Sequence, residues 1–360
     1  MSAPQTPADI AVYIGRFQPF HNGHLALLRH ALDAAPMVVV VIGSAHQART
    51  PKNPFTWQER VEMIRLALTE AERDRVRFLP VRDHYDEARW VAAVKNGVQA
   101  AADQAGLGTR PAVTLIGHFK DATSAYLQQF SGWSLRSVER ASPVDAVHIR
   151  SAWLVCAGND LKAGLRALAS VAPATTLDFM QAWSSLPFYP ALVDEWQMLQ
   201  KYRQAWASAP YAPVFVTVDT VVRCADHVLL IQRGQPPGVG LYAVPGGFIE
   251  ARETAYQSAL RELREETRLS LLESTMKDCL KSSAVFDHPD RSQRGRTITH
   301  AFYFDLGNRA LPEVAADDDA QAAAWVPVAE IVGLEDRFHD DHFHMLEHFL
   351  SLEPAVAQPV

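Results

Sequence analysis

The chain has 360 residues, of which 48% are hydrophobic and 21% charged, and its formal net charge is -7 at pH 7. This composition is typical of a globular protein, the length favours two domains with three as the alternative, and the negative charge argues against nucleic acid as a partner. The first ten residues lack a basic stretch followed by an apolar one, and no apolar run approaches the roughly 18 residues of a membrane span. We therefore expect a cytoplasmic protein without membrane contact, and a homo-oligomer stays open.

The first half of the chain alternates between strand and helix patterns. Residues 10–14 form a short apolar run, the loop GRFQPFHNGH follows, and LALLRHALDAA has a helical pattern. MVVVVIGS and AVTLIGHF are apolar runs typical of strands that are buried on both faces of a parallel sheet. This order predicts an α/β fold in which a doubly wound, Rossmann-like parallel sheet occupies residues 1–185.

The second half of the chain has a different pattern. Residues 186–212 are predicted to form a helical linker with proline-rich ends. VFVTVDTVVR, HVLLIQR, THAFYFDL and AAWVPVAEI then predict strands, whereas residues 254–268 and HFHMLEHFL predict helices. We therefore expect an α+β sandwich over residues 213–352.

The loop after the first strand has the residues of a phosphate site. Gly15 and Arg16 let backbone amides and a guanidinium approach a phosphate, and His21 and His24 can share one face of the next helix's first turn. Positioning and charge neutralisation are the main requirements when one phosphate attacks another. The alternative is structural: the glycine makes a turn and the histidines cap the helix.

This loop resembles the phosphate-binding motif of the nucleotidyltransferase superfamily. Together with GSAHQARTPKNPFTWQER, VRDHYDEARW and GHFKDATSAYL, it makes nearly the whole chain similar to the bifunctional nicotinamide mononucleotide adenylyltransferase/Nudix hydrolase family. The resemblance implies nucleotides as small-molecule partners and ATP as a substrate. It places these residues at ATP: Gly15, Arg16, Phe17, and the catalytic pair His21 and His24. It also places Trp90 and Asp83 near the nicotinamide, although Trp90 as a core residue is the alternative.

The superfamily's second motif is expected at DAVHIR. The resemblance implies that Arg150 is catalytic and holds the β- and γ-phosphates of ATP. Asp145 and Val147 stand where the usual pattern has hydroxyl or amide donors, and a carboxylate beside a triphosphate repels it unless it turns away or shares a metal ion. We therefore expect reduced or altered transfer rather than its loss.

A second site is predicted in GFIEARETAYQSALRELREETRL. Glu262, Glu265 and Glu266 are spaced by three and four residues and so share one helical face, where they repel one another unless divalent cations neutralise them. Oxygen ligands favour Mg²⁺, with Mn²⁺ as a substitute. The alternative is a solvated acidic face.

This stretch resembles the Nudix box at every position but one, because Arg268 replaces a glycine that serves the backbone geometry at the helix end. The resemblance makes Glu262 and Glu266 the main metal ligands and Glu265 a further ligand or the catalytic base. Supporting roles fall to four residues: Gly246 and Gly247, which let the backbone approach the metal, and the expected pair of Glu253 with Arg261.

Two further segments follow the box. PDRSQRGRTITHAF resembles the segment that accompanies ADP-ribose substrates, which implies that Arg291, Arg294 and Arg296 bind ADP-ribose; a solvated basic loop is the alternative. One of the aspartates 317–319 is a candidate additional base. The four histidines of the C-terminal region are interpreted as exposed residues of a closing helix rather than as metal ligands.

The preferred hypothesis is a bifunctional enzyme that makes NAD and pyrophosphate from ATP and nicotinamide mononucleotide and cleaves ADP-ribose to AMP and ribose 5-phosphate. One alternative is a Nudix hydrolase with a weakened or inactive transferase domain. Another is a regulator that senses ADP-ribose or NAD. A sensor is expected to lose box carboxylates and to carry a basic helix pair, whereas this chain keeps Glu262, Glu265 and Glu266, which favours an enzyme.

Overall fold

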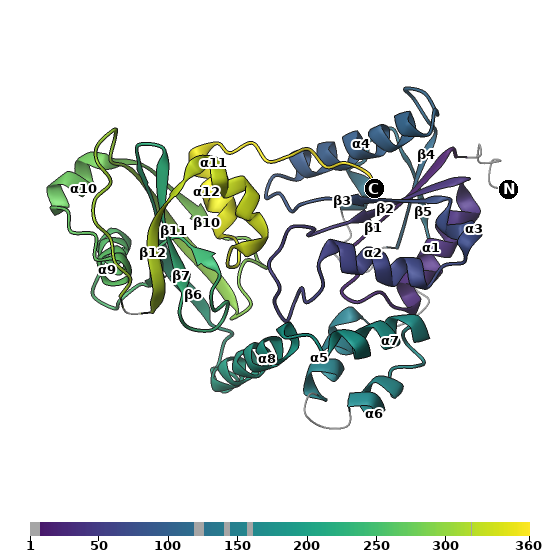
Figure 1. The fold of residues 1–360 in the computed structure, drawn as a ribbon, viewed down its shortest axis with the longest axis horizontal. Helices are drawn as coiled ribbons and strands as arrows, with labels where there is room; N and C mark the ends of the chain where they lie inside the picture. The colour runs from purple at the N-terminus through teal and green to yellow at the C-terminus, as the bar shows by residue number, and fades with distance from the viewer. Residues whose placement is uncertain (1–7, 119–125, 140–144, 157–160, 318) are drawn as a thin grey trace. The chain divides into compact units, whose positions relative to one another are not determined.

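The computed structural model describes residues 8–118, 126–139, 145–156, 161–317 and 319–360 (Figure 1). The chain divides into two compact units: unit 1 contains residues 1–193 and 356–360, and unit 2 contains residues 194–355. Within the described ranges, no helix is both long and apolar enough to cross a membrane. Each unit is described by itself below.

Unit 1 is built on a five-stranded sheet of order β3-β2-β1-β4-β5, in which every strand pair is parallel. The strands are β1 (Ile10–Gly15), β2 (Met37–Ile42), β3 (Val76–Pro80), β4 (Val113–Gly117) and β5 (Ser134–Ser137). All six residues of β2 are buried, as expected for a strand covered on both faces. The predicted doubly wound parallel sheet is therefore confirmed.

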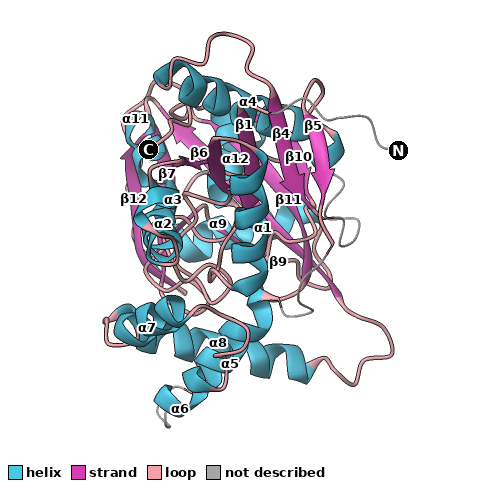
Figure 2. Cartoon of the chain, turned by 90° about the vertical axis from the view of Figure 1, so that its right-hand side faces the viewer, coloured by secondary structure: helices cyan, strands magenta, loops and turns pink. Residues whose placement is uncertain are grey.

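The helices of unit 1 lie between and after these strands along the chain; Figure 2 draws helices in cyan and strands in magenta. They are α1 (Asn22–Ala34), α2 (Trp57–Leu66), α3 (Glu70–Arg73), α4 (Glu87–Gln104), α5 (Ala146–Val155), α6 (Leu161–Arg166) and α7 (Ala174–Trp183). The strand order reverses between β1 and β4, and in open α/β sheets ligands bind outside the carboxyl ends of the strands at such a switch point. The loop after β1 begins at this point.

The end of the chain covers the edge of this sheet. The backbone of Val360 pairs with Phe78 in the edge strand β3, and each residue donates one N–H to the other's carbonyl, at 2.8 and 2.9 Å. Ala357 packs against the apolar core formed by the sheet and α4. These contacts satisfy backbone groups that an edge strand otherwise exposes.

Unit 2 is built on a mixed sheet of order β10-β11-β6-β7-β12, with β8 paired to β7 and β9 paired to β6. Its strands are β6 (Val214–Cys224), β7 (His227–Arg233), β8 (Tyr242–Ala243), β9 (Gly246–Phe248), β10 (Leu280–Phe286), β11 (Arg296–Asp305) and β12 (Ala320–Pro327). Its helices are α9 (Ala255–Thr267), α10 (Glu273–Cys279), α11 (Val328–Ile331), the 3₁₀ turn η2 (Val332–Arg337) and α12 (His342–Leu350).

The sheet of unit 2 has an apolar core on each face. Val222 and Leu229 pack with Leu260 of α9, whereas the neighbouring Val221 and Leu230 belong to the core that contains α12. Neighbouring strand residues point to opposite faces, so the alternation puts the two helices on opposite sides of the sheet. The predicted α+β sandwich is confirmed.

Helix α8 (Phe188–Ala205) contains the point where the two units divide, after Val193. It lies within residues 186–212, where a helical linker was expected. The predicted domain limits, 1–185 and 213–352, stay a prediction.

Candidate active sites

The loop between β1 and α1 is shaped by Gly15 and Phe17. Phe17 has a φ of 52°, and its buried ring folds back so far that a Cβ on Gly15 would lie 2.7 Å from it. A side chain at residue 15 would therefore push the ring away. The same ring contacts the ring of His24 edge-on, with 4.9 Å between the centroids, so that the loop and the first turn of α1 pack as one piece.

His21 and His24 share one face of that turn, as their spacing predicts. Nδ1 of His21 accepts the Gly23 N–H at 3.1 Å and so caps α1, and the two imidazole rings stack with 3.6 Å between their centroids. Burial, together with the neighbouring His21 and His118, lowers the pKa of His24 well below its usual value. Burial thus favours the neutral form of His24, and the role of the two histidines at ATP stays a prediction.

Arginines surround the carbonyl groups of the same loop. Arg150 of α5 donates to the Gln18 carbonyl, and burial beside Arg16 lowers the pKa of Arg150 to about 10, which leaves it charged at neutral pH. Arg16 itself is exposed. The structure therefore brings the predicted residues Gly15, Arg16, Phe17, His21, His24 and Arg150 to the carboxyl end of β1.

Arg60 of α2 was not predicted from the sequence. Its guanidinium is buried and donates to the carbonyls of Arg16, Gly43 and Ser44 at 2.8, 2.7 and 3.0 Å, so it joins the ends of β1 and β2. Burial lowers its pKa to about 9, against the opposing charge of Asp83. No spacing rule marks this residue, because its partners are backbone groups far away in the sequence.

Asp83 and Trp90, expected near the nicotinamide, have different surroundings. Asp83 accepts from the Ser44 hydroxyl at 3.0 Å and from Gln47 at 3.4 Å, which holds its carboxylate beside the turn after β2. Trp90 lies on α4, partly buried, and meets the rings of Tyr126 and Phe130 edge-on at 5.4 and 5.9 Å. The ring is thus packed on the core of unit 1. Residues 119–125, in the middle of GHFKDATSAYL, lie outside the described residues.

The departures in the second motif lie at the start of α5. Asp145 occupies the N-cap position of this helix, and Val147, in its first turn, is 58% exposed. Exposed valine cannot donate a hydrogen bond to a phosphate. Asp145 and Val147 thus lie at the N-terminus of α5, one to two turns before Arg150. An anion site at a helix N-terminus would have hydrogen-bond donors at such positions.

In unit 2, the glycines of the box lie in β9 and are fixed by close packing. A Cβ on Gly246 would lie 2.2 Å from the Val218 carbonyl oxygen, and a Cβ on Gly247 would lie 2.5 Å from the Glu262 carboxylate. A side chain at Gly246 would displace β9 from its partner strand β6, and a side chain at Gly247 would displace it from α9. The glycine pair thus lets the backbone of β9 lie directly against the carboxylates.

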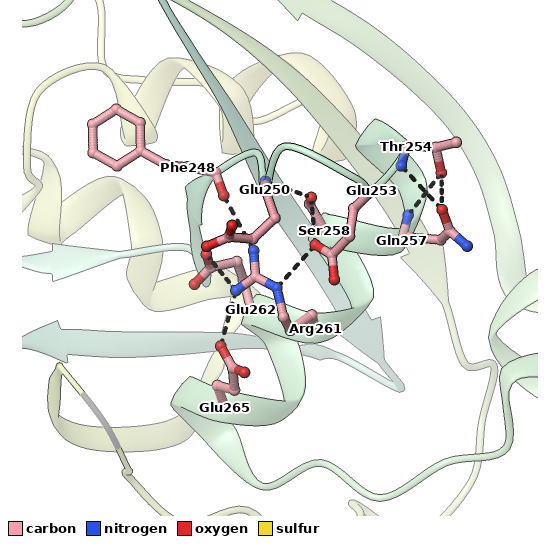
Figure 3. Close-up of polar contacts among 9 residues, drawn as sticks. All are labelled: Phe248, Glu250, Glu253, Thr254, Gln257, Ser258, Arg261, Glu262 and Glu265. Atoms are coloured by element: carbon pink, nitrogen blue, oxygen red, sulfur yellow. Dashed lines mark hydrogen bonds and ion pairs between the residues drawn. The ribbon is translucent and has the colours of Figure 1, made fainter.

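Arg261 is the centre of the carboxylate cluster (Figure 3). Its Nε donates to Glu253 at 2.9 Å, its Nη1 donates to Glu262 and Glu265 at 2.8 and 2.9 Å, and its Nη2 donates to the Phe248 carbonyl at 3.2 Å. Burial alone would lower the pKa of Arg261, but these carboxylates raise it overall. The predicted pair of Arg261 with Glu253 is confirmed, and the same guanidinium also orients two candidate metal ligands.

Glu266 is buried on the inner side of the cluster. Its Oε2 accepts the Gly246 N–H at 2.9 Å, and burial, reinforced by the charge of Glu262, raises its pKa to about 8. Beside it lies Asp219 of β6, which the sequence analysis missed and whose pKa burial raises to about 7. A lone carboxylate within an apolar strand was the available signal for Asp219.

These carboxylates fit a divalent cation. Burial raises the pKa values of Glu266 and Asp219 because negative charge is costly there, and a cation would remove that cost. The donor set consists of oxygen atoms, which suits Mg²⁺ or Mn²⁺ rather than a soft metal.

The three arginines within residues 291–296 make different contacts. Arg291 is buried and forms a bidentate ion pair with Asp341, with both N–O distances at 2.8 Å. Arg294 lies with its guanidinium carbon 5.7 Å from the centre of the Phe248 ring, and Arg296 donates to the Asp287 carbonyl. Arg294 therefore contacts a residue of the box, and Arg291 also lies 4.0 Å from the Asp219 carboxylate.

The end of α9 explains the departure at Arg268. Arg268 adopts a left-handed conformation, with φ 52° and ψ 19°, and its side chain pairs with Asp317 at 2.9 Å. The glycine-favouring geometry expected at this position is confirmed, and the arginine adopts it. Asp319 is exposed, and Asp318 lies outside the described residues.

The prediction of exposed C-terminal histidines is wrong. His339, His342 and His344 are buried, and only His348 is exposed. His342 is buried because its Nδ1 accepts the Val244 N–H at 3.1 Å, and burial lowers its pKa to about 3. The buried histidines lie in or next to α12, which packs in an apolar core of unit 2, and the interpretation that they do not bind a metal stays a prediction.

Comparisons with known proteins match both units. A family model described as NUDIX domain matches residues 213–349, and one described as cytidylyltransferase-like matches residues 12–94. A nicotinamide/nicotinic acid mononucleotide adenylyltransferase of Acinetobacter baylyi is 33% identical over 196 residues, which are 54% of this chain and 94% of that protein.

Solved structures extend the similarity to the whole chain. The crystal structure of a bifunctional NMN adenylyltransferase/ADP ribose pyrophosphatase from Francisella tularensis, complexed with AMP and a manganese ion, has a TM-score of 0.85 and 32% identity, and covers 96% of this chain and 99% of its own. A second structure of that bifunctional protein has the same TM-score and coverage, with 34% identity. The match thus includes both units and the region between them.

Proposed function

The chain belongs to the family of bifunctional NMN adenylyltransferases/ADP-ribose pyrophosphatases, and from that premise we propose two reactions, one for each unit. Unit 1 joins ATP and nicotinamide mononucleotide into NAD and releases pyrophosphate. Unit 2 adds water to ADP-ribose and releases AMP and ribose 5-phosphate. The presence of a complete carboxylate cluster in unit 2 favours an enzyme over a sensor.

The observation that carries the transferase proposal is the set of basic groups gathered at the carboxyl end of β1. The stacked His21 and His24 and the buried, charged Arg150 surround one short loop, where an incoming triphosphate meets positive charge and hydrogen-bond donors. The mononucleotide phosphate attacks the α-phosphorus of ATP, and pyrophosphate leaves. Little proton movement is required, so positioning and charge neutralisation supply most of the rate.

For the nicotinamide end of the substrate, we propose Trp90 and Asp83. The half-buried Trp90 ring offers an aromatic surface to a cationic pyridinium, and Asp83 supplies negative charge near the turn after β2. The edge-on contacts of Trp90 with Tyr126 and Phe130 hold its ring in a fixed orientation.

The observation that carries the hydrolase proposal is the carboxylate cluster around Arg261, against which Gly247 packs directly. We assign Glu262 and Glu266 as the main ligands of Mg²⁺, with Mn²⁺ as a substitute, and Glu265 as a further ligand or the base that takes a proton from water. When bound, the metal neutralises phosphate oxygens and lowers the pKa of water. Gly246 contributes by placing its backbone beside Glu266.

For ADP-ribose binding, the three arginines divide into two roles. The guanidinium of Arg291 would have to break its ion pair with Asp341 before it could bind a diphosphate. We therefore assign Arg291 a structural role beside the site. Arg294 and Arg296 are assigned to the substrate, because both are only partly buried and neither forms the bidentate ion pair that engages Arg291.

Product analysis by chromatography tests both reactions. Wild-type protein with Mg²⁺ is incubated with ATP and nicotinamide mononucleotide or, separately, with ADP-ribose, beside the variants His24→Ala and Glu266→Gln. We expect NAD from the first mixture and AMP from the second, with each product lost only in its own variant. AMP without NAD would establish that only the hydrolase works, and ADP-ribose binding without either product would support a sensor instead.

A further inference from the structure

The residue after the glycine pair, Phe248, has no role in the chemistry assigned above. Its carbonyl accepts from Arg261 at 3.2 Å, while its ring points away from that guanidinium (Figure 3). The side chain is 41% exposed, and the described members of the two apolar cores of unit 2 do not include it. An aromatic ring is thus presented at the surface one residue from the glycine that touches Glu262.

The ring is held in place by neighbours from three segments. Phe215 of β6 meets it edge-on, with 6.0 Å between the centroids, and Phe215 is supported in turn by Trp206, at 5.4 Å. Arg294 lies over the Phe248 ring with its guanidinium carbon 5.7 Å from the centroid. An aromatic ring packed against Phe215, with a guanidinium over it, therefore lies next to the carboxylates.

The segment that carries Arg294 is fixed on the same side. Its Gln293 carbonyl accepts from Arg203 of α8 at 2.7 Å, and a Cβ on Gly295 would lie 3.2 Å from the Phe215 ring. Gly295 has a φ of 154°, so the backbone passes close to the ring where a larger residue would be strained. These contacts keep Arg294 near Phe248 rather than free in solvent.

We propose that Phe248 and Arg294 form the binding surface for the adenine ring of ADP-ribose. This inference rests on the proposed hydrolase function and specifies how its substrate is bound. A base has a flat π face that stacks on phenylalanine and attracts a guanidinium, whereas the terminal ribose has none. Phe248 directly follows Gly247, which packs against Glu262. With the diphosphate at the Glu262 cluster, the nucleoside end of the substrate is therefore within reach of the Phe248 ring.

The test separates the two ends of the substrate by product inhibition of ADP-ribose hydrolysis. AMP carries the base and ribose 5-phosphate does not, and inhibition of this reaction reports on unit 2 alone. In Phe248→Ala, we expect KM for ADP-ribose and the inhibition constant of AMP to rise about 5- to 150-fold, the range for loss of one base–aromatic stack, with little change in kcat. The inhibition constant of ribose 5-phosphate should stay unchanged.

Three further variants separate stacking from folding. Phe248→Leu keeps an apolar side chain without a π face and should behave like the alanine variant, whereas Phe248→Trp should restore tight AMP inhibition. Tyr211→Ala, which removes an aromatic ring that is 86% exposed, is the matched control and should change nothing. Any of three results would overturn the proposal. These are unchanged inhibition by AMP in Phe248→Ala, equally weakened inhibition by AMP and by ribose 5-phosphate in that variant, and full activity in Phe248→Leu. Absence of hydrolysis by the wild-type protein would overturn the proposed function and this inference with it.

Discussion

The two candidate sites, both assigned to phosphate groups, are lined by side chains of opposite character, basic in unit 1 and acidic in unit 2. In unit 1, the loop after β1 is surrounded by histidines and by arginines such as Arg150, which donate to backbone carbonyls. In unit 2, carboxylates surround one arginine, Arg261, and the buried Glu266 has a raised pKa. The first site is prepared to bind an anion directly, whereas the second is prepared to bind a cation that then binds the anion.

This difference shows how each site obtains its rigidity. The arginines of unit 1 are held by backbone carbonyls, as Arg60 shows with three of them, so the shape of the site depends on the loops. The carboxylates of unit 2 are held by side chains on one helix and by the strand that packs against them. Mutations should therefore affect one reaction and leave the other unchanged, and the predictions below test that separation.

The largest effect is expected at Arg150. Replacing it with methionine removes a buried positive charge from the triphosphate site, and we expect kcat/KM for NAD formation to fall by about 10²- to 10³-fold. Hydrolysis of ADP-ribose should not change. Steady-state kinetics of both reactions on the same preparation check this, and a parallel fall in hydrolysis would show that the sites are not independent.

A smaller loss is expected at Arg261 of unit 2. Methionine at this residue leaves Glu262 and Glu265 without the group that orients them, and loss of such a supporting contact lowers activity by about 10- to 100-fold. Arg264→Met on the same helix is the matched control, because Arg264 is exposed. Equal losses in the two variants would mean that charge on the helix matters and that the contacts of Arg261 do not.

The buried His342 predicts a pH dependence of stability. Its pKa is about 3 in the folded protein because of burial, against about 6.5 in an unfolded chain. Below pH 6.5 the unfolded chain binds a proton that the folded chain does not, so stability falls as the pH decreases towards 3, by about 2 kcal/mol at pH 5. The charged groups that act on it are Asp341, Arg291, Arg233 and Arg294.

Urea unfolding at pH 7.5 and pH 5 measures this effect. His342→Asn keeps an acceptor for the Val244 N–H but cannot be protonated, so its stability should fall less than that of the wild type between the two pH values. The comparison of the two proteins cancels the contributions of other titrating groups. Identical pH dependence in both proteins would contradict the assignment.

A gain of activity is expected in the second motif of unit 1. The double variant Asp145→Ser, Val147→Thr removes a negative charge and adds two hydroxyl donors at the start of α5. We expect kcat/KM for ATP in NAD formation to rise by up to about ten-fold, with hydrolysis unchanged. A decrease would show that the native carboxylate serves the reaction, for example by sharing a metal ion.

The smallest effect is expected at the end of α9. Arg268→Gly relieves a left-handed backbone conformation and removes an exposed ion pair with Asp317, and we expect a small net gain in the stability of unit 2. The temperature of half-inactivation of hydrolysis should rise slightly. Arg268→Ala, which loses the ion pair without relieving the backbone, should not show this gain.

The sequence by itself determined the fold class and predicted the local side-chain patterns of both candidate sites. Alternating strand and helix patterns predicted the parallel sheet of unit 1, because residues buried on both faces form continuous apolar runs such as Met37–Ile42. The spacing of Glu262, Glu265 and Glu266 predicted the carboxylate face, because a helix has a fixed repeat. Contacts that are local along the chain were therefore predictable.

Only the tertiary structure decided which residues meet across the chain. Arg60 lies on backbone carbonyls of distant loops, Asp219 lies beside Glu266, and Arg291 is engaged with Asp341, and none of these pairings follows from a local spacing. The C-terminal histidines were predicted to be exposed because a closing helix tolerates exposed histidine, whereas His342 is buried and its Nδ1 accepts the Val244 N–H. Burial and long-range pairing depend on how strands and helices pack, which local sequence patterns do not specify.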